Sequence, residues 1–119
     1  MKKVLCVSRH QMTEEQRSNL ERGLGDSLEL IPWRNTVESI EELLPAIEGT
    51  DALAVVLPTD LLAKLMEYVG ERPVLYAVSE RRRTGRMHTL PDGRQEAEFA
   101  FVHREWRQVV RMEFVSRPL

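Results

Sequence analysis

The sequence predicts an α/β protein: a small Rossmann-like parallel sheet with flanking helices and a β-rich C-terminal extension. Residues 1–80 alternate between short apolar runs typical of buried strands and amphipathic stretches typical of helices. Residues 81–119 instead contain extended stretches around one turn signal. Strand–helix–strand units favour parallel pairing with right-handed crossovers and helices on both faces. We therefore expect one domain over residues 1–119, with a βαβαβαβ core in 1–80 and a hairpin extension in 81–119.

Four apolar runs are the expected strands of the parallel sheet. They are Lys2–Ser8, Ser27–Trp33, Asp51–Leu57 and Pro73–Ser79. The third is apolar at every position after its first, which is typical of a strand buried on both faces. Pro32 in the second run indicates the end of a strand or an edge of the sheet.

The first connecting helix is predicted from its ends. Thr13 and Gln16 have the spacing of a capping box, in which the two side chains bond to each other's backbone N–H groups. The helix should run to about Leu24 and stop at Gly25, because glycine readily adopts the left-handed conformation that ends helices.

Two further helices are expected. Residues Thr36–Ile47 place apolar side chains on one face, although Pro45 should distort or shorten the helix. Leu61–Val69 should form the third helix, with Thr59 as its N-cap.

The C-terminal extension is expected to be a hairpin. The turn signal Pro91-Asp92-Gly93 separates the extended stretches Arg86–Leu90 and Gln95–His103. Trp106–Val115 could be a further antiparallel strand or a short helix, and its β-forming residues favour the strand.

Composition bounds the class of protein. A chain of 119 residues with 42% hydrophobic and 30% charged residues can build one folded core. Its apolar runs are far shorter than the roughly 20 residues that span a bilayer, and no secretory signal pattern is present, so we expect a cytoplasmic protein with no membrane partner. The single cysteine, Cys6, excludes an intramolecular disulfide and a cysteine-based zinc site, and we expect it to be a small core residue.

The charge is unevenly distributed along the chain. Residues 1–70 have a net charge of −5, whereas residues 71–119 have a net charge of +3 and contain ten arginines but no lysine. Arginine suits planar, bidentate contacts with phosphate. A pI near 5.9 argues against binding to long nucleic acids, but a local anion site stays open.

Candidate ligand-binding residues follow the strands, because ligands of open parallel sheets bind beyond the carboxyl ends of the strands. They are Ser8, Arg9, His10 and Gln11 after the first strand, Arg34-Asn35-Thr36 after the second, Thr59 and Asp60 after the third, and Ser79 with Arg81, Arg82 and Arg83 after the fourth. Helix N-termini at the same edge favour phosphate. Each group also has an ordinary explanation, namely a polar loop, a helix cap or a solvated charged run.

Several chemistries are excluded or disfavoured. No G-x-G-x-x-G follows the first strand and there is no G-x-x-x-x-G-K-[ST], so a dinucleotide cofactor and nucleoside triphosphate hydrolysis are disfavoured. The histidines, His10, His88 and His103, lack paired metal-ligand spacing, so we expect neither a metal nor another cofactor. Phosphate binding remains, with or without metal-independent phosphodiester cleavage.

Two short motifs resemble the small stand-alone CARF-like ring nucleases of type III CRISPR systems. They are Val7-Ser8-Arg9-His10 and Leu57-Pro58-Thr59-Asp60-Leu61-Leu62-Ala63. The segment Arg9–Leu24 is similar as well, and so is the tail, with Tyr76, the arginine run, the Asp92-Gly93 turn, His103 and Trp106.

This resemblance implies a homodimer that binds a cyclic oligoadenylate, in particular cyclic tetra-adenylate, and cleaves it without a metal. In that mechanism a ribose 2′-OH attacks the adjacent phosphorus. The catalytic residues would be Ser8, Arg9 and His10, and the ligand-binding residues would be Gln11, Thr59, Asp60, Ser79, Arg81, Arg82 and Arg83. Two alternatives stay open: a ring-binding protein without cleavage, and a protein-interaction domain whose arginine-rich part binds an acidic partner. The hairpin could be a lid, an extension of the sheet or a dimer interface.

Overall fold

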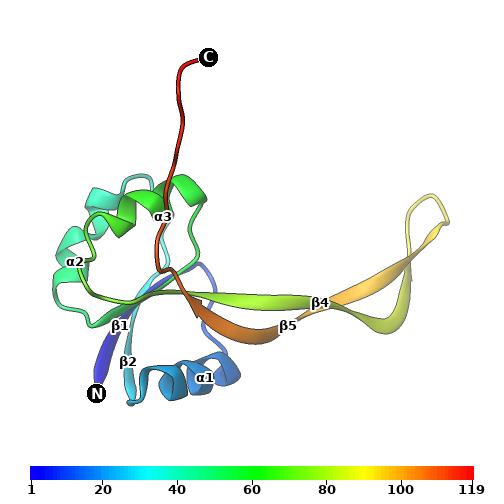
Figure 1. The fold of residues 1–119 in the computed structure, drawn as a ribbon. Helices are drawn as coiled ribbons and strands as arrows, with labels where there is room; N and C mark the ends of the chain where they lie inside the picture. The colour runs from blue at the N-terminus through cyan, green and yellow to red at the C-terminus, as the bar shows by residue number, and fades with distance from the viewer.

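The computed structural model describes all residues 1–119 and has a mixed α/β fold built on one five-stranded, mostly parallel sheet (Figure 1). The strands are β1 (Lys2–Val7), β2 (Leu28–Trp33), β3 (Ala52–Val55), β4 (Val74–Thr89) and β5 (Gln95–Gln108). Their order is β2-β1-β3-β4-β5, in which β5 alone runs antiparallel to its neighbour. The predicted parallel sheet is confirmed. The chain adds β2 on one side of β1 and β3 on the other, so the strand order reverses at β1.

Helices cover both faces of the sheet, as predicted (Figure 1). They are α1 (Glu14–Leu24), the 3-10 helix η1 (Ile40–Leu43), α2 (Leu44–Glu48) and α3 (Thr59–Met66). Leu20 of α1 packs with Val4 and Leu28 on one face. On the other face, the larger core joins η1, α2 and α3 to Leu5 and Leu53. None of these helices has the length and hydrophobicity that a membrane crossing requires.

Both ends of α1 form as the sequence predicts. The Thr13 hydroxyl accepts a hydrogen bond from the Gln16 N–H, and the Gln16 side chain accepts one from the Thr13 N–H. At the other end Gly25 has a φ of 73° and donates its N–H to the Glu21 carbonyl. This region of the backbone map suits glycine, so the helix ends there.

The second helical segment is shorter than predicted. It begins at Ile40 rather than Thr36, because Ser39 has an extended backbone and is the N-cap residue. The Glu42 carboxylate accepts the Ser39 N–H, as in a second capping box, which was not predicted. Pro45 lies in the first turn of α2, where its missing N–H costs nothing, so the expected shortening around it is confirmed.

The expectation that Thr59 caps the third helix is wrong. Pro58 is the N-cap residue, because its carbonyl accepts the N–H of Leu62 and so closes the first turn. Thr59 is the first helical residue, and α3 ends at Met66 instead of Val69.

The largest departure from prediction is the length of the last two strands. The fourth strand does not end at Ser79 but continues to Thr89, so that Arg81–Arg83 lie inside it. It pairs with β5 from Leu75 opposite Gln108 to Thr89 opposite Gln95. Because this pairing satisfies the backbone, no loop is needed after Ser79.

The end of the chain also differs from prediction. Trp106 belongs to β5, and residues 109–119 form neither strand nor helix, so the further strand expected over Trp106–Val115 is absent beyond Gln108. The turn at residues 91–93 is confirmed. Gly93 has a φ of 87° and donates its N–H to the Leu90 carbonyl.

The outer part of the hairpin, which we call the arm (residues 79–103), extends away from the sheet and its helices (Figure 1). The radius of gyration is 17.7 Å, whereas a compact chain of this length would have about 13–14 Å. The ladder changes register between Val78 and Ser79 and again between Arg83 and Met87. Such irregularities increase the local twist and redirect a strand pair.

Candidate functional site

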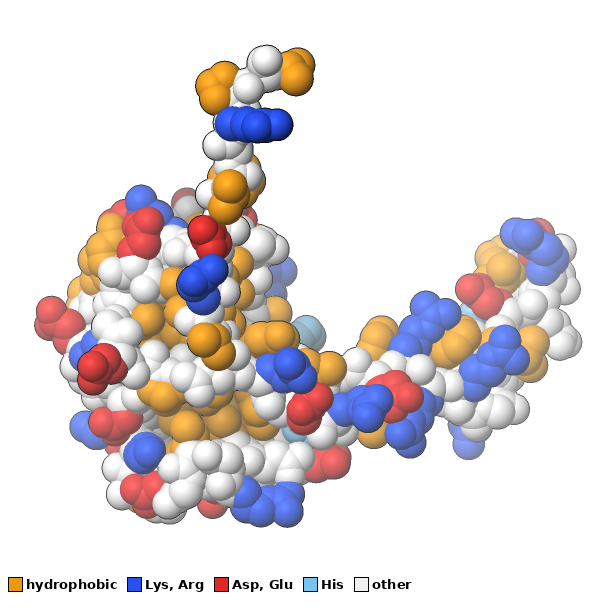
Figure 2. All heavy atoms as spheres, viewed as in Figure 1, with side chains coloured by type: hydrophobic (Ala, Val, Ile, Leu, Met, Phe, Trp, Pro, Cys, Tyr) orange, Lys and Arg blue, Asp and Glu red, His pale blue; other side chains and the backbone are white.

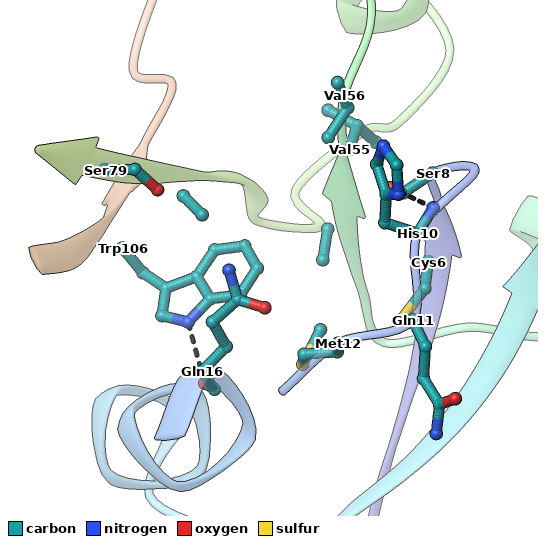
Figure 3. A pocket seen from close by; sticks show the side chains of 12 residues that line it. Cys6, Ser8, His10, Gln11, Met12, Gln16, Val55, Val56, Ser79 and Trp106 are labelled. Carbon is teal, nitrogen blue, oxygen red and sulfur yellow. Dashed lines mark hydrogen bonds between the residues drawn. The ribbon is translucent and has the colours of Figure 1, made fainter. Parts of the chain in front are cut away.

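A cavity of about 230 Å³ lies at the carboxyl edge of the sheet, beside the reversal of strand order at β1 (Figure 3). The loop after β1 contributes Ser8, His10 and Gln11, and β4 contributes Ser79. Trp106 of β5 lines the side facing α1. Four of the residues predicted from strand ends are therefore brought together in one cavity.

The loop after β1 is held by hydrogen bonds at its start. The Ser8 N–H donates to the Trp33 carbonyl at 3.2 Å, and the Val56 N–H donates to the Val7 carbonyl at 2.8 Å. The Ser8 hydroxyl then accepts the N–H of His10 at 3.1 Å (Figure 3). This bond occupies an acceptor site of Ser8 and leaves its hydroxyl proton free for a ligand.

Trp106 is the one aromatic residue that lines this cavity, and the predicted site residues do not include it. Its indole N–H donates to the Gln16 carbonyl at 2.8 Å, which fixes the ring between β5 and the start of α1 (Figure 3). The position of Trp106 depends on the register change between Val78 and Ser79. Arg104 has no directly opposite partner there, so β5 contains one extra residue between His103 and Trp106. Sequence alternation gives no signal of that extra residue.

The same irregularity brings His103 and Trp106 to one face of β5, with ring centroids 6.0 Å apart. Both ring nitrogens of His103 are shielded from solvent and have no hydrogen-bond partner. His103 is therefore a packing residue of the hairpin.

Arg9 lies outside the Trp106-lined cavity. It lines a neighbouring cavity with Asn35, Thr36 and Pro58, which also reaches Ser8. Its guanidinium donates to the Thr36 hydroxyl at 2.5 Å. Ser8 and Val56 therefore line both cavities.

Of the remaining predicted residues, Arg34 lines a third cavity, of about 200 Å³, with Ser8, His10 and Gln11. The others do not converge with His10. Thr59 and Asp60 begin α3, are exposed and line neither cavity. The expectation that Arg81, Arg82 and Arg83 stand at the ligand-binding edge is wrong in this chain, because β4 carries them out along the arm. A strand rises by about 3.3 Å per residue, so each step beyond Ser79 takes the side chains farther from the cavity.

Cys6 lines the cavity from within β1. Burial raises the pKa of its thiol to about 11, and the positive charge of Arg17 opposes this rise only in part. The thiol is therefore neutral at physiological pH and behaves as a small apolar group, as predicted. No group of three or more His, Cys, Asp or Glu side chains is placed to hold a metal ion.

Together these side chains present an imidazole, an amide, two hydroxyls and an indole to one hollow. An indole face can stack on a planar base, whereas hydroxyl and amide groups can pair with ribose or phosphate oxygens. An imidazole can act as a general base or a general acid. The arrangement suits a nucleotide-like ligand and proton transfer to or from it.

The chain matches no protein-family model, and no curated protein or solved structure shows significant similarity to it.

Proposed function

We propose that this protein binds a cyclic oligoadenylate between two copies of the chain and cleaves it without a metal. The observation that carries the proposal is the convergence of Ser8, His10, Gln11 and Ser79 with the indole of Trp106 in one cavity. Adenine offers a planar face to the indole, and its ribose and phosphate offer oxygens to the hydroxyl and amide groups.

The size of the cavity favours a shared site. Pockets for ligands of drug size usually measure about 300–1,000 Å³, whereas this cavity measures about 230 Å³. One copy therefore has room for a single nucleotide unit at most, and a ring of four needs a second copy. A ring with two-fold symmetry is matched by two copies related by the same symmetry.

The proposed reaction uses the nucleophile that RNA itself contains. His10 removes the proton from a ribose 2′-OH, whose oxygen attacks the adjacent phosphorus. The new bond from phosphorus to O2′ forms as the bond to O5′ breaks, and the leaving 5′-oxygen takes up a proton from water. The products are a 2′,3′-cyclic phosphate and a 5′-OH. Ser8 and Gln11 orient the ribose and phosphate oxygens, since correct alignment of attacking and leaving groups supplies much of such a rate.

The charge of the reacting phosphate would be stabilised by Arg9 once it releases Thr36. Both groups are exposed at the surface, so a phosphate can compete for the guanidinium.

A second candidate function, ring binding without cleavage, is favoured by the same arginines. Arg9 is bonded to Thr36 and Arg82 to Glu80. Arg34 lines a separate cavity with Ser8, His10 and Gln11, and no guanidinium lines the cavity that contains Trp106. A cavity with this lining binds neutral base and ribose groups more readily than it stabilises a phosphoryl transition state.

Incubation with labelled cyclic tetra-adenylate and cyclic hexa-adenylate, in the presence of a chelator, separates these functions. Cleavage should give linear products ending in a 2′,3′-cyclic phosphate. We predict that His10→Ala slows cleavage by about 10²–10⁴-fold and leaves ring binding largely intact, because it removes the general base while Trp106, Ser8 and Gln11 still line the cavity. His88→Ala is the matched control, because His88 lies on the arm and pairs with Glu96 at 3.5 Å; it should cleave at the unchanged rate.

Each outcome supports or contradicts one of the two candidate functions. Retention of an intact ring would select the binding function, and unchanged cleavage by His10→Ala would remove His10 from the chemistry. A protein that neither binds nor cleaves either ring would refute both functions.

A further inference from the structure

The arm has two faces of different chemistry, because alternate residues of a strand point to opposite sides. On one face, which we call the Phe99 face, the cross-strand pairs are Arg81 with Phe101, Arg83 with Phe99 and Met87 with Ala97. The opposite face, which we call the Glu80 face, contains Glu80, Arg82, His88, Glu96, Ala100, Val102 and Arg104.

The charged side chains of the Glu80 face pair with one another. Glu80 forms ion pairs with Arg82 at 2.9 Å and with Arg104 at 3.8 Å, and His88 lies 3.5 Å from Glu96. Opposite charges paired across or along a ribbon are typical of a face that stays in water.

The Phe99 face is neither apolar core nor a balanced polar surface. Phe101 is 76% exposed and Met87 is 56% exposed. The guanidinium of Arg81 lies 3.8 Å from the centre of the Phe99 ring, and that of Arg83 lies at 6.0 Å. Neither arginine has a carboxylate partner within ion-pair distance. This face therefore combines exposed apolar groups with positive charges that lack a counter-ion.

Such a face needs a partner to be stable. A two-stranded ribbon alone is marginal in water unless a third layer packs against it. Here no helix covers the arm, which extends from the body in Figure 1, and Figure 2 shows arginine side chains along its length. Exposed apolar surface bordered by charge typically marks a binding surface.

We propose that the Phe99 face of the arm packs on the body of a second copy of this chain. The body, by which we mean residues 1–78 and 104–119, carries the complementary charge, since its net charge is −3 and that of the arm is +1. It also has an apolar hollow of about 250 Å³ at the root of the arm, whose six lining residues are all hydrophobic. Two arms exchanged about a two-fold axis would satisfy both surfaces at once, because each copy supplies one arm and one body.

The hollow fits this occupant in shape and charge. Val56, at 71% exposure, and Tyr76 give it open apolar walls that an aromatic ring of the arm can fill. Leu57 and Leu62 line it as well, and the exposed carboxylate of Asp60 lies between them in sequence, at the start of α3. Arg81 and Arg83 would then find the counter-ion that their own chain does not supply.

The test compares two variants that introduce the same charge on opposite faces of one strand. Sedimentation of the unliganded, unmodified protein should give a dimer at micromolar concentration. Phe101→Asp should raise the dimer Kd by about 30-fold or more, the loss that defines a central interface residue. Ala100→Asp, one residue away on the Glu80 face, should leave the dimer unchanged. Thermal unfolding of both variants shows whether the body stays folded, since Phe101 lies outside both cores.

A photo-reactive phenylalanine analogue at position 101 provides a second measurement, which does not depend on disrupting the interface by a substitution. Irradiation should join two chains, with the attachment mapped by mass spectrometry to residues around the hollow at Val56 and Leu62. A monomeric unmodified protein, or a Phe101→Asp variant that dimerises normally, would overturn the proposal. So would a monomer whose arm binds single-stranded nucleic acid.

This inference does not depend on the ligand of the cavity. A dimer that neither binds nor cleaves a ring would contradict the proposed function alone. A dimer that cleaves the ring, and that forms equally well in Phe101→Asp, would contradict the arm exchange alone.

Discussion

Burial of Cys6 in β1 makes a prediction about stability at alkaline pH. The pKa of its thiol is about 11 in the folded chain, against an ordinary value of 9.0. Between these two pH values the unfolded thiol ionises while the folded one does not, so ionisation favours the unfolded chain. The stabilisation is complete below pH 9 and is lost as the pH rises toward 11.

We predict that the free energy of unfolding falls by up to about 2 kcal/mol between pH 8 and 10.5 because of this one group. Urea titrations of the unmodified protein and of Cys6→Ala, at both pH values, isolate its contribution from other groups that titrate there. The decrease should be smaller in Cys6→Ala by this amount, and equal decreases in the two proteins would contradict it.

Individual residues of the site were predictable where the signal is local to a strand end. Ser8, His10 and Gln11 follow β1 directly, and the rule that ligands bind beyond the carboxyl ends of strands is sufficient to select them. Arg9 follows the same strand but turns to Thr36, because neighbouring residues of a loop can point in different directions. Trp106 could not be selected, since its place depends on an extra residue in β5 that no sequence pattern marks.

At the scale of elements, α1 is the one whose start the sequence defines most directly. Its capping box joins Thr13 and Gln16 by two hydrogen bonds. We predict that Thr13→Ala lowers the free energy of unfolding by about 1 kcal/mol, because the N–H of Gln16 then loses its partner. Urea unfolding measures the change. Ser18→Ala, at an exposed position of the same helix, is the control and should be neutral or slightly stabilising.

The elements whose ends could be predicted from the sequence are those with a glycine, proline or capping residue at their ends. Gly25 ends α1, and Pro45 limits α2 to a short helix. β4 has no such residue at Ser79, because the segment Ser79–Thr89 contains residues that suit either a loop or an exposed strand. Its continuation depends on pairing with β5, a contact between segments distant in sequence. This is why the arginine run was placed at the ligand-binding edge and lies instead on the arm.

The whole molecule divides into a body with two cores and an arm with none. The 11 buried residues of the larger core and the six of the smaller one all belong to the strands, helices and loops of the body. The net charge of each half could be read from the sequence, but the separation of the arm from the body could not, because it results from two register changes in one ladder.

This division predicts two levels of protection from hydrogen exchange. Amides of β1 and β3 lie between two covered faces, so their exchange requires global unfolding. Amides of the arm are hydrogen-bonded only across one ribbon, so in a monomer they should exchange orders of magnitude faster through local opening.

In Phe101→Asp, where the arm is free, hydrogen exchange measured by mass spectrometry should show this full difference between arm and body. In Ala100→Asp, whose arm stays packed on the second copy, the arm should approach the protection of the body. Arm amides that exchange as slowly as those of β1 in monomeric Phe101→Asp would mean that the ribbon is stable by itself, and the reason for requiring a partner would disappear.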